Sequence, residues 1–196
     1  MAPFPPHSGA PEMTRQKIEG FGALIAFGAT IPIANWMIGN VGTVCIPNGP
    51  CLIPVAPSIM APSGVLMIGL ALVLRDLVQR RLGRAWSLGA IVAGALISAM
   101  LAPAALVVAS TVAFFLSELA DFLVYTPLQR RRLVLAVTMS SLVGLTVDSL
   151  VFLYLAFGSI EFLGGQIIGK SWMVLISIPF IRMIRDRDAR LGIEPA

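Results

Sequence analysis

The sequence predicts an all-α polytopic membrane protein, a bundle of six transmembrane helices. Of its 196 residues, 57% are hydrophobic and only 12% are charged, about half the charged fraction of an ordinary soluble domain. The apolar residues form six long runs, each close to the roughly 20 residues that a helix needs to cross a bilayer. Among the connections between these runs, only alternate ones carry arginine or lysine, which places all the cationic connections on one side of the membrane.

The runs define the expected elements in chain order. The six spans are residues 18–38, 62–80, 86–102, 104–125, 133–157 and 160–182. Residues 1–17 are rich in Pro and lack the apolar core of a signal peptide, so we expect a disordered cytoplasmic tail there. The transmembrane domain then covers residues 18–184, and residues 185–196 form a basic cytoplasmic tail.

The cations set the expected orientation. They precede the first span, follow the second and the fourth, and follow the sixth, as Arg15, Lys17, Arg80, Arg81, Arg84, Arg130, Arg131, Arg132, Arg182, Arg185, Arg187 and Arg190. The positive-inside rule therefore places both termini in the cytoplasm of a bacterial inner membrane. These residues are topology signals and partners for lipid headgroups, so the net charge of +4 does not indicate a nucleic-acid-binding protein.

The outer loop, residues 39–62, carries no charge and is unusually apolar and rich in proline. Backbone that is not helical is tolerated at membrane depth only where protein buries it or water reaches it. The loop therefore either folds over the outer mouth of the bundle or lies on the headgroups. Cys45 and Cys51 bracket its "IPNGP" turn, and a disulfide and two free thiols are both compatible with that spacing.

Ionisable residues within the spans are the main functional signal, because each is costly in lipid and needs a partner. Asp148 and Lys170 each lie about ten residues, roughly 15 Å, from the turn that joins the last two spans. Equal depth predicts that they pair. Arg75 in the second span lies at the level of Glu118 and Asp121 in the fourth, so it can neutralise one of them.

With Asp76, the acids of the second and fourth spans outnumber the single arginine. Part of this excess can reach water, since Asp121 lies near the membrane boundary. Either the charges form a buried network that fixes helix register, or the surplus acid binds a ligand with several N–H donors or relays protons. The candidate substrate-binding residues are Arg75, Asp76, Glu118, Asp121, Asp148, Lys170, Asn35, Trp36, Gln166 and Ser141.

Enzymatic alternatives find little support in the sequence. The single histidine, His7, lies in the tail, and two cysteines are too few for a thiolate metal site. A Ser141–Lys170 dyad would join groups whose depths differ by about 10 Å. No nucleotide-binding loop occurs, and we expect neither a cofactor nor a metal. A purely structural assembly factor would leave the surplus buried acid unexplained.

Four segments carry a resemblance to a known family. They are "RDLVQRRLGR" at 75–84, "SELADFLVYTPLQRRR" at 117–132, "SSLVGLTVDSLVFLYLAFG" at 140–158 and "GQIIGK" at 165–170. Together they resemble the queuosine precursor transporter family, also called the vitamin uptake transporter group, from about residue 60 to 182. At the position of Ser141 that family often has Asn.

The resemblance implies a six-span importer of 7-cyano-7-deazaguanine or 7-aminomethyl-7-deazaguanine for salvage of the tRNA nucleoside queuosine. Its architecture would be similar to that of the substrate-binding subunits of energy-coupling-factor importers. The alternative is such a subunit for another vitamin. Glu118 is the first candidate for the guanine-like edge of the base, followed by Asp121 and Asp148. Whether the chain acts alone, as a homo-oligomer or with a coupling subunit is left open.

Overall fold

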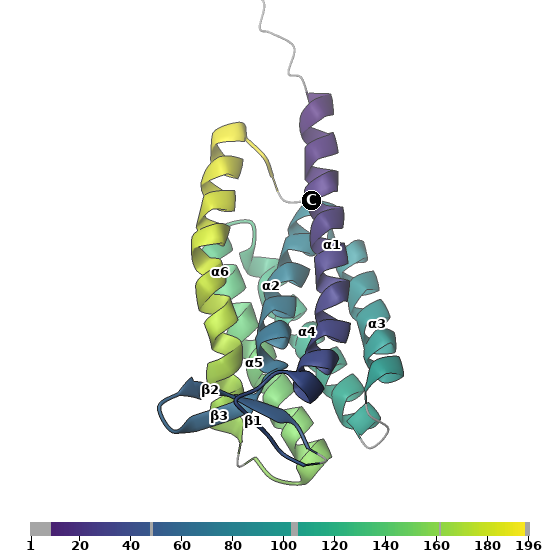
Figure 1. Cartoon of the computed structure of the whole chain (residues 1–196). Coiled ribbons are helices and arrows are strands. Elements are labelled where there is room, and N and C mark those ends of the chain that lie inside the picture. Colours follow the sequence, from purple (N-terminus) through teal and green to yellow (C-terminus); the bar gives the residue numbers. More distant parts are fainter. Residues whose placement is uncertain (1–8, 48, 103–105, 161, 195–196) are drawn as a thin grey trace, which may run out of the picture.

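The computed structural model describes residues 9–47, 49–102, 106–160 and 162–194. Six helices run side by side, and a small three-stranded sheet covers one end of the bundle (Figure 1). The helices are α1 (Gly9–Asn40), α2 (Val65–Leu82), α3 (Arg84–Leu101), α4 (Val107–Leu128), α5 (Leu133–Phe157) and α6 (Leu163–Leu191). The strands are β1 (Val44–Cys45), β2 (Cys51–Ala56) and β3 (Ile59–Pro62).

The predicted fold class is confirmed. Each expected span overlaps one helix, and five of the helices, all except α2, are long and apolar enough to cross a membrane. Helix α2 carries Arg75, Asp76, Arg80 and Arg81 among its 18 residues, a high charge content for so short a membrane-spanning helix. At 1.5 Å per residue it is still about 27 Å long, close to the thickness of a bilayer core.

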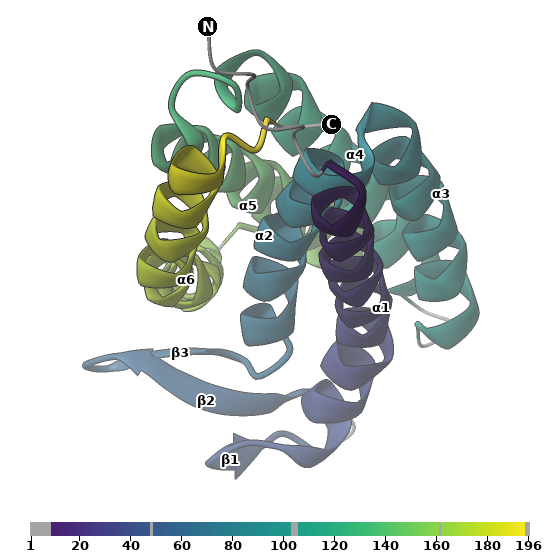
Figure 2. The same cartoon turned by 90° about the horizontal axis from the view of Figure 1, so that it is seen from above.

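Helix α2 lies inside the bundle, and this position explains its polarity. It contacts all five other helices, and the view from above shows it enclosed by them (Figure 2). Its buried residues include Leu72, Val73 and Val78, which belong to the largest apolar cluster of the core. Because α2 faces protein rather than lipid, its charged side chains can meet partners on neighbouring helices.

The ends of α1 and α6 differ from the expected tails. Helix α1 begins at Gly9, so residues 9–17, expected to be disordered, are helical; residues 1–8 lie outside the described residues. Helix α6 continues to Leu191 and ends at Gly192, whose φ of 66° suits a left-handed helix cap. Much of the expected basic tail is therefore an extension of the last helix.

Ion pairs at the basic end explain why α6 extends past its apolar run. Asp188 on α6 accepts from Arg80 and Arg81 on α2 at 2.7 and 2.9 Å. Glu19 on α1 pairs with Arg81 at 3.1 Å and with Arg187 on α6 at 2.6 Å. The network ties three helices together at one end, and its groups would be unpartnered if α6 stopped at the apolar boundary.

The outer loop folds over the end of the bundle opposite to the arginines. The antiparallel strands are ordered β1-β2-β3, and Val55, Ala61 and Val65 pack there as a small apolar cluster. The indole Nε1 of Trp172 on α6 donates to the carbonyl of Val55 at 2.8 Å. Of the two expected arrangements, the structure has the one in which the loop covers the bundle.

The strands also explain how this apolar backbone satisfies its hydrogen bonds. Residues 52–54 of β2 pair with residues 60–62 of β3, and the Ser63 hydroxyl donates to the carbonyl of Met37 at 2.7 Å. Cys45 and Cys51 lie opposite each other across β1 and β2 and form a disulfide. The loop therefore pairs its polar groups internally, as backbone near a membrane must.

Glycines set the closest contacts around α6. Gly69 of α2 packs directly on the backbone carbonyl of Lys170, and Gly165 packs on the carbonyl of Met60 in β3. Gly169 faces the side chains of Val65 and Val55. The small residues of "GGQIIGK" thus admit one helix and the sheet to the same stretch of α6.

Gly69→Ala should lower stability by about 1–3 kcal/mol, because its methyl group would overlap the backbone of Lys170. Thermal unfolding of the detergent-purified chain measures the effect. Gly22→Ala in α1 is the matched control, since open space surrounds Gly22 and alanine favours a helix by up to about 1 kcal/mol. Equal shifts in the two variants would contradict the close α2–α6 contact.

Candidate functional site

Helices α2 and α4 bring one arginine and three carboxylates together in the bundle interior. The Arg75 Nη2 atom lies 2.8 Å from Asp76 Oδ1 and 2.5 Å from Asp121 Oδ1. Its Nε atom donates to Glu118 Oε2 at 3.2 Å. None of the four side chains is more than 2% exposed. We call these four residues the Arg75 cluster.

Two more polar groups and an aromatic ring complete the surroundings of Arg75. Its Nη1 atom donates to Gln79 Oε1 at 3.2 Å, so each guanidinium nitrogen has a partner. The ring centroid of Tyr125 lies 5.7 Å from the guanidinium carbon, within the range of a cation–π contact. The Ser140 hydroxyl on α5 donates to Asp76 Oδ2 at 3.1 Å. A third helix therefore takes part in the cluster.

The charge of this cluster is not balanced by its own members. One guanidinium faces three carboxylates, and burying an unpaired charge is far more costly than burying a paired one. The balance requires protons on the carboxyl groups or a cationic or N–H-rich ligand among them. Asp121 is fully buried, so the expectation that part of the excess acid reaches water is wrong.

Helices α5 and α6 form a second group, the Lys170 cluster of Lys170, Asp148, Ser149 and Gln166. The predicted ion pair between Lys170 and Asp148 is present, with Nζ 2.6 Å from Oδ2. The same Nζ donates to Ser149 Oγ at 2.7 Å and to Gln166 Oε1 at 2.6 Å. All four side chains are buried.

The hydrogen bonds of Lys170 argue against the catalytic serine–lysine dyad that was considered from the sequence. An ammonium group has three N–H donors and no acceptor, and Lys170 uses all three. The serine beside it is Ser149 rather than Ser141, and the Ser149 hydroxyl donates to the carbonyl of Leu145. Lys170 is therefore arranged as a hydrogen-bond donor to an anion and two neutral oxygens, and not as a base.

The two clusters are neighbours. Asp148 lies close enough to Glu118 for the two carboxylates to interact electrostatically. Gly144 on α5 leaves room for the α4 carboxylates, since a methyl group there would lie 3.1 Å from Asp121 Cβ. Polar groups of α2, α4, α5 and α6 thus form one buried region across the bundle, and we take this region as the candidate site.

Two hydroxyl groups in this region make no hydrogen bond to the described part of the chain. They are the Oγ of Ser141 on α5 and the Oη of Tyr125 on α4, and both are buried. Buried polar atoms are nearly always paired, so such atoms call for an explanation. Beside a surplus of carboxylate, they give the region further capacity to bind a polar ligand.

Two of the expected site residues lie elsewhere. The Asn35 side chain donates to the carbonyl of Ile31 on its own helix, and Trp36 is 59% exposed on the outside of the bundle. Both lie near the outer end of α1, away from the two clusters. The other eight candidates line the buried region or its margins.

Five further residues contact the clusters but are not among the candidates from the sequence: Gln79, Phe122, Tyr125, Ser140 and Ser149. Spacing gives a signal for two of them, because Gln79 lies one turn after Arg75 and Tyr125 one turn after Asp121. The contacts of Ser140 and Ser149 can be inferred only once it is known which helices pack against α5. In the described residues, no group of three His, Cys, Asp or Glu side chains is arranged to hold a metal ion.

Removing the cation of the second cluster should destabilise the fold. Lys170→Met leaves Asp148 without its cation, and breaking a buried pair costs about 3–5 kcal/mol. Lys170→Met with Asp148→Asn removes both charges and should recover most of that loss. Thermal unfolding in detergent compares the variants, with Lys17→Met at the exposed end of α1 as control. A double variant as unstable as the single one would contradict the pairing.

Comparison with known proteins adds one match. Residues 99–184 match the model of a family described as "Putative vitamin uptake transporter". The match covers less than half of the chain, from the end of α3 into α6, and excludes Arg75 and Asp76. No curated protein and no solved structure matches the chain. Over the helices that carry Glu118, Asp148 and Lys170, the chain is therefore similar to a family of vitamin uptake transporters.

Proposed function

We propose that this chain imports a small molecule across the inner membrane of a bacterium and that the molecule is a queuosine precursor. The observation that carries the proposal is the Arg75 cluster, in which three fully buried carboxylates face one guanidinium. A cluster that served only to hold helices together would need one or two acids. The additional acid suits a ligand that donates hydrogen bonds.

The substrate class follows from the chemistry of that ligand. A 7-deazaguanine presents a ring N–H and an exocyclic amine side by side, and one carboxylate accepts both. Such paired, charge-assisted hydrogen bonds are stronger than neutral ones. Adenine lacks this pair of donors and would leave the carboxylate unpaired, which a buried site rejects strongly. The family match supports the coarser part of this proposal, a transporter for a vitamin-like compound.

Glu118 is the first candidate for the base-binding carboxylate. One of its oxygens accepts from Arg75, and it also interacts electrostatically with Asp148 of the Lys170 cluster. In 7-aminomethyl-7-deazaguanine the substituent adds a cation, and Asp121 or Asp148 would neutralise it. Since both clusters are closed to solvent, a ligand can enter only when helices or the outer sheet move apart.

The orientation proposed from the sequence agrees with where the cations gather. The arginines that join α1, α2 and α6 lie at one end of the bundle, and the uncharged sheet lies at the other (Figure 1). We place the basic end in the cytoplasm. The substrate would then enter past the sheet and leave between the basic helix ends.

A second candidate within transport is a substrate-binding subunit of an energy-coupling-factor importer for another vitamin. The description of the matched family favours it, because that description names vitamin uptake without a substrate. Such a subunit would co-purify with a transmembrane coupling protein and ATPases. An importer that works alone would be purified without them and would still catalyse uptake in proteoliposomes.

Ligand-dependent stabilisation tests the substrate class. In a thermal-shift assay of the detergent-purified chain, 7-cyano-7-deazaguanine and 7-aminomethyl-7-deazaguanine should raise the melting temperature, because bound ligand stabilises only the folded state. Guanine and biotin serve as comparison compounds. A shift with biotin alone would favour the second candidate, and no shift with either deazaguanine would overturn the proposed substrate.

Glu118→Gln should weaken deazaguanine binding roughly 10- to 100-fold, since hydrogen bonds to a charged group contribute about 1.5–3 kcal/mol. The amide keeps the shape of the side chain and can still accept from Arg75, so the variant should reach the membrane in normal amounts. Asp186→Asn removes an exposed acid of α6 as the matched control. Loss of the Glu118 variant from the membrane would indicate a structural role instead, and unchanged binding would exclude Glu118 from the site.

A further inference from the structure

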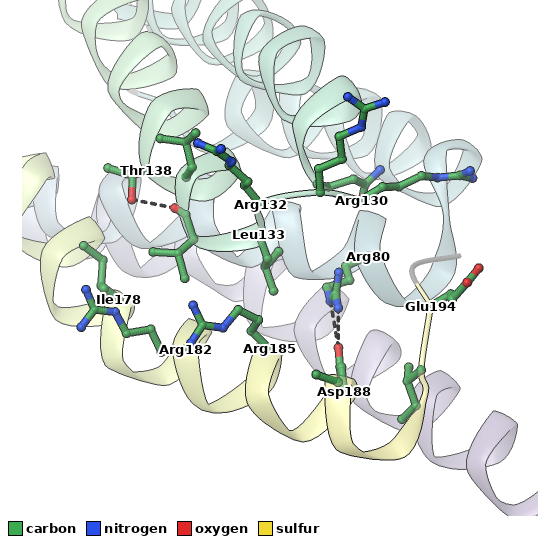
Figure 3. Close-up of a pocket in the computed structure, with 16 residues that line it drawn as sticks. Arg80, Arg130, Arg132, Leu133, Thr138, Ile178, Arg182, Arg185, Asp188 and Glu194 are labelled. Atoms are coloured by element: carbon green, nitrogen blue, oxygen red, sulfur yellow. Dashed lines mark hydrogen bonds and ion pairs between the residues drawn. The ribbon is translucent and has the colours of Figure 1, made fainter.

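A cleft outside the candidate site lies at the basic end of the bundle between α5 and α6. Its volume is about 880 Å³. Six arginines line it: Arg80 from α2, Arg130, Arg131 and Arg132 from the α4–α5 connection, and Arg182 and Arg185 from α6. Figure 3 shows Arg182 and Arg185 on the side of α6 that faces α5.

Most of this positive charge is not neutralised by the protein. Two acids line the cleft, Asp188 and Glu194, and Asp188 is occupied by Arg80 and Arg81. Arg185 pairs with its exposed neighbour Asp186. The remaining four arginines, Arg130, Arg131, Arg132 and Arg182, are exposed and make no ion pair with the described residues. The cleft therefore attracts an anion.

The other wall of the cleft is apolar and continues toward the middle of the membrane. Leu135 on α5 and Ile178 on α6 line the cleft. Beyond them, Met139 and Leu142 follow Leu135 at intervals of four and three residues, which places all three on one face of α5, and all three are exposed. Leu175 is exposed one turn beyond Ile178 on α6. An apolar track about 10 Å long leads from the arginines along the helices.

We propose that this cleft binds an anionic phospholipid from the leaflet at the basic end. The phosphate lies among the arginines of the α4–α5 connection and α6, and one acyl chain lies along Leu135, Met139 and Leu142. A free phosphate or a soluble anion would use the charges but leave the apolar wall exposed to water. A zwitterionic lipid would cover the wall but leave the arginine charge uncompensated. Basic pockets between helices at this depth suit anionic headgroups.

The test uses the full-length chain, delipidated by exchange into a neutral detergent. Native mass spectrometry counts bound lipid during titration with phosphatidylglycerol or with phosphatidylcholine, and thermal stability is followed with inorganic phosphate. Phosphatidylglycerol should bind at least about tenfold more tightly than phosphatidylcholine, and phosphate should neither stabilise the chain nor displace the lipid. Equal binding of the two lipids, or equal stabilisation by phosphate, would overturn the proposal.

A pair of charge variants locates the site. Arg182→Gln with Arg185→Gln removes two cations from the cleft and should weaken phosphatidylglycerol binding roughly tenfold or more, because each cation near an anionic lipid contributes about 1 kcal/mol. Arg84→Gln with Arg190→Gln removes two exposed cations outside the cleft and should change binding less than about twofold. Both variants keep the buried ion pairs. Equal losses in the two variants would show a general attraction to charge and would overturn the assigned cleft.

Discussion

A guanidinium group cannot lose its proton inside a protein, so a buried arginine needs an anion beside it wherever the fold places it. Arg75 takes one from its own helix, Asp76, and two from α4, Glu118 and Asp121. These contacts fix the depth and rotation of α2 against α4. They also require the charged face of α2 to meet protein, because a buried charge in lipid without a partner is very costly. The other five helices then take the positions around it (Figure 2). Because Arg75 needs anions beside it, three carboxylates lie together in the bundle, and the proposed binding site depends on this excess of acid.

Helix α6 links that region to the outer sheet. Over one stretch it holds the Lys170 cluster and also supports the sheet, through Gly165 under β3 and the indole of Trp172 on β2. Gly69 of α2 lies against the backbone of Lys170 itself. Close-packed helices and backbone contacts of this kind move together, because there is little free volume to absorb a displacement. Under the proposed function, a motion of the sheet that admitted a ligand would therefore shift α6, and with it the ion pair to Asp148.

The sequence predicts most of the fold because local patterns of hydropathy and charge determine where the spans lie and how they are oriented. Six apolar runs and their flanking arginines place the helix ends within a few residues, except for the start of α1 and the end of α6. Equal depth in a hairpin pairs Asp148 with Lys170. The strands are harder to foresee, because their pairing depends on the surface that they cover. The partners Ser140 and Ser149 depend on how neighbouring helices are rotated, which no local pattern encodes. Trp36 was expected at the site because an aromatic ring near polar groups can stack on a ligand, but it faces outward, where aromatic residues near a membrane surface are common.

Depth gives the cations of this chain three different roles. Arg75 and Lys170 lie inside the bundle, where each needs carboxylates from other residues and the groups around it become the candidate site. Arg80 and Arg81 lie at the basic end, where they form ion pairs with Asp188 and Glu19 that connect α1, α2 and α6. The arginines beyond that layer have fewer acids within reach, so their charge faces water and headgroups. The positive-inside rule concentrates arginine at the cytoplasmic end, and a leaflet of anionic lipid would supply the charge that the acids there do not. The unpaired arginines of the cleft therefore follow from the same rule that sets the topology.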